Sequence, residues 1–130
     1  MTLPDRLRQH PRLTAWAVLA WAVLLFVASV VPIHSIPIPS SELSIDKLMH
    51  GLLYIPLGLA ACLAARERGS RRLPALFFGA AVSGVYGLGL EFVQAFLPWR
   101  SFEWMDAAFD LVGGSAGAGA ATLAGILKTG

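Results

Sequence analysis

Four long apolar segments constrain the fold of this chain more than any other feature. The predicted spans cover about residues 13–31, 46–65, 73–97 and 103–127, and each is near the roughly 20 residues that an α-helix needs to cross a bilayer. Hydrophobic residues make up 56% of the 130 residues and charged residues only 14%, which is unlike a soluble domain. The sequence therefore predicts an all-α, four-transmembrane-helix bundle that forms a single domain over residues 1–130.

The first span has two interpretations, because a positive tail followed by an apolar run is also typical of a secretory signal peptide. The apolar run is longer than a typical signal core, and no small-x-small cleavage site precedes Pro32. These observations favour a retained helix, which prolines at positions 32, 37 and 39 then terminate.

Arginine and lysine residues are distributed unevenly between the two sides of the predicted bundle. Eight of the ten lie in the N-terminal tail, in the turn at residues 66–72 or at Lys128, whereas Lys47 and Arg100 belong to the other two loops. Because positive residues concentrate on the cytoplasmic side, we expect both termini to be cytoplasmic and residues 32–45 and 98–104 to face outward. Trp99 and Trp104 fit an outer interfacial belt. The expected location is the inner membrane, with several passes.

Polar and ionisable side chains gather at the predicted outer ends of the spans. Helical spacing of three or four residues places them on shared faces of the second, third and fourth spans, and these faces carry, in chain order, Asp46, His50 and Tyr54, then Glu91 and Gln94, then Asp106 and Asp110. Such groups are costly at membrane depth, so a cluster of them indicates a functional site.

Each member of the cluster also has a structural interpretation. Asp46 is suited to cap a helix, and His50 or Glu91 to join two helices by a hydrogen bond. Glu91 is the least easily explained in this way, because it follows a long apolar run. The whole set of polar residues is larger than four helices need for hydrogen bonds between them.

Small residues predict how the third and fourth spans pack. Gly79, Ser83 and Gly87 share one face of the third span, and Gly113 and Gly117 share one face of the fourth. Such stripes permit close contact between helices in lipid. The spacing predicts that these two spans pack against each other and bring their acids side by side.

The remaining composition narrows the function. The net charge is only +2, and the basic residues form no stripe along the sequence. The sequence therefore predicts no nucleic-acid partner. The single cysteine, Cys62, forms no internal disulfide and is expected to be a small buried residue.

Three short elements at the helix ends resemble those of the VanZ-like family of small bacterial membrane proteins. They read D-K-x-x-H-x-x-x-Y at residues 46–54, E-x-x-Q followed by P-x-R-S at residues 91–101, and D-x-x-x-D-x-x-G-x-x-x-G at residues 106–117. The resemblance covers roughly residues 30–120. One residue departs from it: the family usually has asparagine where this chain has Asp110. The extra acid requires a protonated carboxyl or a compensating cation.

The resemblance implies a role in the cell envelope, and the family takes its name from an accessory protein linked to teicoplanin resistance. The first hypothesis is therefore an accessory protein that binds the head group of a membrane lipid or lipid-linked cell-wall precursor. Lys47 and Arg100 would meet phosphate, and His50, Tyr54 and Gln94 would orient it. The full predicted ligand-binding set is Asp46, Lys47, His50, Tyr54, Glu91, Gln94, Arg100, Ser101, Asp106 and Asp110.

Two alternatives remain open. The second hypothesis is an intramembrane enzyme in which His50, Glu91 and Asp106 are the catalytic candidates, working as acid and base or through a divalent cation. The third is a structural or proton-coupled bundle in which the same groups form a network only. The sequence leaves catalysis, a bound metal and the oligomeric state undecided.

Overall fold

The described residues of the computed structural model form four α-helices. The structure describes the backbone of residues 11–31, 43–99 and 102–129, and the side chains of residues 13–31, 47–99 and 102–127. The helices are α2 (Pro11–Val30), α3 (Leu43–Glu67), α4 (Arg72–Ala95) and α5 (Trp104–Thr129), and no strand occurs in these ranges. All four are long and apolar enough to cross a membrane. The predicted all-α, four-span fold is confirmed, and the helix ends lie within three residues of the expected ones.

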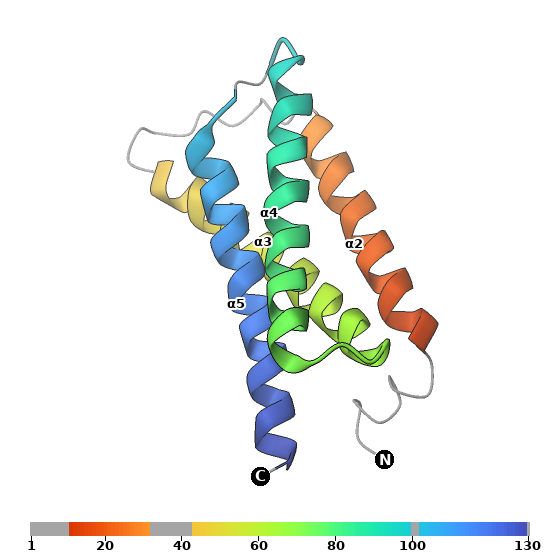
Figure 1. Ribbon diagram of the computed structural model, residues 1–130. Helices are drawn as coiled ribbons and strands as arrows, with labels where there is room; N and C mark the ends of the chain where they lie inside the picture. The colour runs from red at the N-terminus through yellow and green to blue at the C-terminus, as the bar shows by residue number, and fades with distance from the viewer. Residues whose placement is uncertain (1–10, 32–42, 100–101, 130) are drawn as a thin grey trace.

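Three of the helices form the compact part of the bundle. α3 packs extensively against α5 and α4, and α4 packs against α5, whereas α2 contacts mainly α3. Figure 1 shows α4 and α5 side by side, α3 passing obliquely behind them, and α2 at the edge of the bundle. The start of α2 and the end of α5 lie at the same end of the bundle as the turn between α3 and α4 (Figure 1).

Glycines set the distance between α3 and α5. A Cβ atom built on Gly113 would lie 1.9 Å from the carbonyl oxygen of Gly51, and one on Gly117 would lie 2.0 Å from that of Ile55. Similarly, a Cβ on Gly58 would lie 1.9 Å from the carbonyl oxygen of Gly114. The two backbones are therefore in direct contact, as small residues allow in lipid.

This packing corrects one expectation. The glycine spacing predicts that Gly113 and Gly117 contact α4, whereas the structure places both against α3. The glycine of this stretch that meets α4 is Gly114, whose added Cβ would lie 2.0 Å from the Cβ of Ser83. One residue turns a helix by about 100°, so adjacent glycines on α5 face different neighbours.

Helix α2 is held largely by polar contacts, because most of its large apolar side chains point outward. Four side-chain hydrogen bonds join it to α3 and α4. The Trp21 Nε1 donates to the Leu53 carbonyl at 2.7 Å and Gln94 Nε2 to the Ser29 carbonyl at 3.1 Å, while the hydroxyls of Thr14 and Tyr86 donate to the Glu67 carboxylate and the Ala22 carbonyl. Polar bonds of this kind are a common means of joining helices in a membrane.

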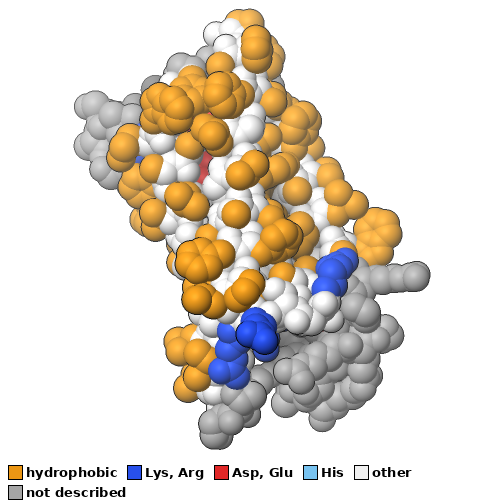
Figure 2. All heavy atoms as spheres, viewed as in Figure 1, with side chains coloured by type: hydrophobic (Ala, Val, Ile, Leu, Met, Phe, Trp, Pro, Cys, Tyr) orange, Lys and Arg blue, Asp and Glu red, His pale blue; other side chains and the backbone are white. Residues whose placement is uncertain are grey.

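The turn between α3 and α4 is short and positively charged. Gly69 has a φ of 90°, and its neighbourhood forms a Schellman motif, with the Gly69 amide donating to the Arg66 carbonyl and the Ser70 amide to that of Ala65. Arg66, Arg68, Arg71 and Arg72 lie in or beside this turn. Figure 2 shows an apolar surface over most of the visible face and basic side chains near one end. This separation suits a chain that crosses a membrane.

Opposite accessibility of Ser40 and Ser70 is the expected result of cysteine labelling. In a Cys62→Ala background, a cysteine at position 40 should react with a membrane-impermeant reagent in intact cells. A cysteine at position 70, beside the arginine-rich turn, should react only after the membrane is opened, because positive loops stay cytoplasmic. Labelling of both positions from the same side would contradict the predicted orientation.

Candidate functional site

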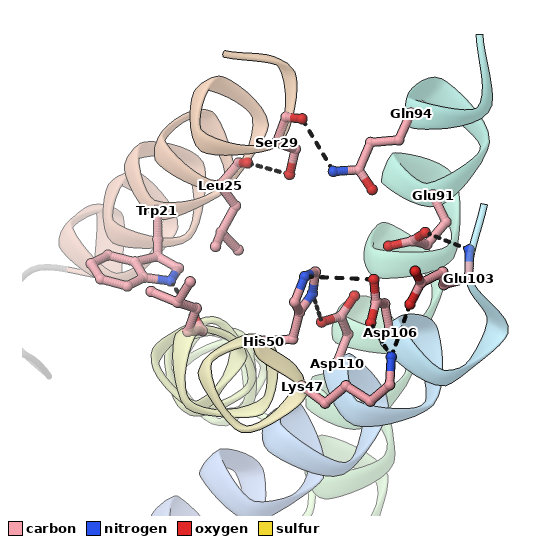
Figure 3. Close-up of polar contacts among 11 residues, drawn as sticks. Trp21, Leu25, Ser29, Lys47, His50, Glu91, Gln94, Glu103, Asp106 and Asp110 are labelled. Carbon is pink, nitrogen blue, oxygen red and sulfur yellow. Dashed lines mark hydrogen bonds and ion pairs between the residues drawn. The ribbon is translucent and has the colours of Figure 1, made fainter. Parts of the chain in front are cut away.

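The ionisable side chains of three helices converge at the end of the bundle opposite the arginine-rich turn (Figures 1 and 3). α3 contributes its first described turns, α4 its last turns and α5 its first turns. The antiparallel order of these helices brings residues about 60 positions apart in sequence into contact. We call Lys47, His50, Glu91, Glu103, Asp106 and Asp110 the polar cluster.

Lys47 connects the start of α3 to the start of α5. Its Nζ donates to Glu103 Oε2 at 2.9 Å and to Asp106 Oδ1 at 3.0 Å. The exposed fractions are 18% for the lysine, 11% for Asp106 and 42% for Glu103. This lysine is therefore already shared between two carboxylates, which reduces its ability to meet a phosphate alone.

His50 lies between the two aspartates of α5. Its Nδ1 is 3.1 Å from Asp110 Oδ1, and its Nε2 is 3.8 Å from Asp106 Oδ2. Asp110 is 1% exposed, whereas the His50 side chain is 22% exposed. The histidine is thus more accessible than either aspartate of α5.

Glu91 approaches the same place from α4 and is 1% exposed. Its Oε2 accepts a hydrogen bond from the Glu103 amide at 3.2 Å. One helical turn earlier, Gly87 leaves space for Asp110: a Cβ there would lie 2.6 Å from Asp110 Oδ2. The expected juxtaposition of the α4 and α5 acids beside a glycine is present in the structure.

Two predicted site residues lie at the margin of the cluster. The Gln94 amide group donates to the Ser29 carbonyl of α2, and Figure 3 shows it above Glu91 with its oxygen toward the space between the helices. Tyr54 is buried one turn deeper than His50, in an apolar cluster with Leu25, Leu57 and Leu90. Direct ligand contact by either residue stays a prediction.

Three further predicted residues lie outside the described set: the residues Arg100 and Ser101, and the side chain of Asp46. Conversely, Glu103 belongs to the polar cluster although the sequence interpretation left it out. It directly precedes α5, and its carbonyl accepts a hydrogen bond from the Asp106 amide, so its position three residues before Asp106 was a signal in the sequence. The bond from Gln94 to α2 had no such local signal.

Aromatic side chains border the cluster. Phe92 and Phe102 have ring centroids 5.2 Å apart, and Phe102 and Trp104 make an edge-on contact at 4.7 Å. Trp99 and Trp104 are exposed. Aromatic residues of this kind are enriched at the level of lipid head groups.

A hollow lined by described residues lies elsewhere in the bundle. It measures about 680 Å³, lies between α2, α3 and α4 near the arginine-rich turn, and is lined largely by apolar residues such as Ala61, Phe78 and Val82. The ionisable groups therefore mark the candidate site better than the hollow does.

The fold and the cluster define a class: a multi-pass α-helical membrane protein with a largely buried group of ionisable side chains at one end of the bundle. The particular family follows from the whole chain. The VanZ/LLP1 family model matches residues 9–125, and the chain belongs to this family. No curated protein and no solved structure shows a match. The resemblance inferred from the three sequence elements is thus confirmed.

Proposed function

We propose that this membrane protein binds the polar head group of an envelope lipid or of a lipid-linked cell-wall precursor. The observation that carries the proposal is the convergence of Glu91, Asp110 and His50 within 4.8 Å at one end of an apolar bundle. Ionisable groups at membrane depth are costly and are typically functional. The partly exposed His50 side chain and the aromatic residues that border the cluster fit a ligand that enters from the head-group layer.

The charge of the polar cluster restricts how a head group binds. Within residues 47–99 and 102–127, four carboxylates of this cluster have Lys47 and His50 as their basic partners. A hydroxyl or ammonium group fits carboxylates directly, whereas a phosphate needs an additional positive charge. We therefore expect a head group that either carries hydroxyl or amino groups or binds with a cation.

Lipid analysis of gently extracted protein tests this proposal. The full chain, extracted with its surrounding lipid, is compared with the bulk membrane by native mass spectrometry and lipid analysis. One head-group class should be enriched about tenfold, which corresponds to roughly 1.4 kcal/mol of preference. His50→Ala should abolish the enrichment, because it removes the partly exposed side chain that lies between Asp106 and Asp110.

Glu67→Gln is the matched control, because Glu67 lies at the other end of α3 and bonds Thr14 of α2. It should keep the enrichment. Lipids identical to the bulk membrane in the parent protein, or equal enrichment in His50→Ala, would refute head-group binding. An accessory role in teicoplanin-type tolerance is a further part of the proposal, and it predicts greater susceptibility in cells that lack the protein.

A second candidate function is an intramembrane hydrolase or transferase that acts on a lipid-linked substrate. The contact between His50 and the buried Asp110 at 3.1 Å favours it, because a carboxylate that orients a histidine is a common arrangement in general acid–base catalysis. Product formation from a head group identified as above, abolished in Asp110→Asn with the lipid still bound, would support this alternative over simple binding.

A further inference from the structure

Three helices each supply one metal-ligating side chain to a single point. His50 of α3, Glu91 of α4 and Asp110 of α5 each offer a ligand atom, and these atoms lie within 4.8 Å of one another. Two ligand atoms that each lie about 2.0–2.2 Å from one zinc ion are closer to each other than 4.8 Å. A small rotation of the side chains would therefore place all three on one ion.

Burial gives an independent indication that a positive charge belongs there. Glu91 and Asp110 are each 1% exposed, and an isolated buried carboxylate is strongly destabilised. Lys47 pairs with Glu103 and Asp106 instead. Among the described residues, Glu91 forms no ion pair and accepts its hydrogen bond from a backbone amide.

We propose that His50, Glu91 and Asp110 bind one divalent transition-metal ion, of which zinc is the best fit. Two ionised carboxylates and a neutral imidazole carry a charge of −2, which a divalent ion balances. One nitrogen and two oxygen donors suit zinc better than magnesium or calcium, which prefer oxygen alone. Three protein ligands also leave one position of a tetrahedral ion open.

Asp106 and Lys47 complete this arrangement as positioning residues. When His50 Nδ1 ligates the metal, its Nε2–H points toward Asp106 Oδ2, now 3.8 Å away. Histidine ligands commonly donate their second ring nitrogen to a carboxylate, which fixes the tautomer. Lys47 holds Asp106 at 3.0 Å and thereby orients the histidine indirectly.

The metal site goes beyond head-group binding and stands without it. A phosphate oxygen of a head group would be able to supply the fourth ligand. This would reconcile an acidic cluster with an anionic head group. The alternative to a metal ion is a protonated His50, whose imidazolium would form ion pairs with Asp106 and Asp110.

Metal titration of the full chain in detergent distinguishes these two alternatives. The protein is purified through a tag without histidine, stripped with EDTA and titrated with Zn²⁺, Mn²⁺, Mg²⁺ or Ca²⁺. We expect one Zn²⁺ per chain by elemental analysis, and a melting temperature that rises with zinc and falls again with EDTA. Absence of stoichiometric zinc in the folded parent would overturn the proposal and favour the protonated histidine.

Variants assign the ligands. His50→Ala, Glu91→Gln and Asp110→Asn should each weaken zinc binding by more than about 100-fold, and Asp106→Asn by about 10–100-fold as an outer partner. Glu103→Gln is the matched control, because it removes a carboxylate from the same cluster but no ligand, and should weaken binding less than about tenfold. Equal weakening by Glu103→Gln and Asp110→Asn would overturn the assignment.

Folding and ligation are separated by two further readouts. Asp110→Asn restores the residue that is usual in the family, so it should stay helical and monodisperse while the zinc-dependent rise in melting temperature disappears. Co²⁺ bound in place of zinc should give visible absorption that changes in His50→Ala. A parent protein that binds zinc but enriches no lipid would refute the head-group proposal alone. A parent protein that enriches a lipid but binds no zinc would refute the metal site alone.

Discussion

Gly113→Ala is expected to lower the free energy of unfolding by about 3 kcal/mol or more, which is the upper part of the range for overpacked cores. The new Cβ would lie 1.9 Å from the Gly51 carbonyl oxygen and 2.6 Å from its carbonyl carbon. These are backbone atoms of another helix, so no side-chain rotation relieves the clash. α3 and α5 must separate, and the contacts along the most extensive interface of the bundle weaken with them.

Gly119→Ala is the matched control for this change, because Gly119 lies on the same helix and has no atom within 4 Å of the position of an added Cβ. It should leave stability unchanged or raise it by up to about 1 kcal/mol, the helix-propensity difference between alanine and glycine. Unfolding in a denaturing detergent, followed by circular dichroism, measures both variants. Equal stability of Gly113→Ala and Gly119→Ala would contradict the backbone contact between α3 and α5.

Lys47→Met is expected to have the second large effect, a loss of about 2–3 kcal/mol. The Lys47 ammonium contacts Glu103 and Asp106 at 2.9 and 3.0 Å, and without it His50 is the one basic side chain among the described residues of the polar cluster. Breaking a fully buried pair costs about 3–5 kcal/mol, and the 18% exposure of Lys47 places this case lower. The same unfolding measurement applies, with Arg66→Met in the exposed turn as a control of small effect.

Double substitutions show which carboxylate depends on the lysine. Lys47→Met with Asp106→Asn should regain more of the lost stability than Lys47→Met with Glu103→Gln. Asp106 is 11% exposed and Glu103 is 42% exposed, and exposed ion pairs contribute less because water screens them. A larger recovery with Glu103→Gln would show that Asp106 is compensated by another group, and the positioning role assigned to Lys47 would be wrong.

The sequence by itself determined the number of apolar helices and their approximate bounds. It also showed that the acids of the polar cluster lie at the end of α4 and at the start of α5. These are local properties. A helix that crosses a membrane satisfies its backbone hydrogen bonds within its own segment, so an apolar run of sufficient length is enough to predict it. The spacing of Asp106 and Asp110 on α5 and the position of Glu91 near the end of α4 were likewise legible without any neighbour.

Only the tertiary structure decided which neighbour each face meets. Gly113 and Gly117 contact α3 rather than α4, Gln94 bonds to α2, and Glu103 joins Lys47. Periodicity defines a face along one helix but contains no information on the crossing of two helices, and a rotation of about 100° separates adjacent residues. The approach of His50, Glu91 and Asp110 to within 4.8 Å of one another depends on the rotations of three helices at once, and the packing of the helices sets these rotations.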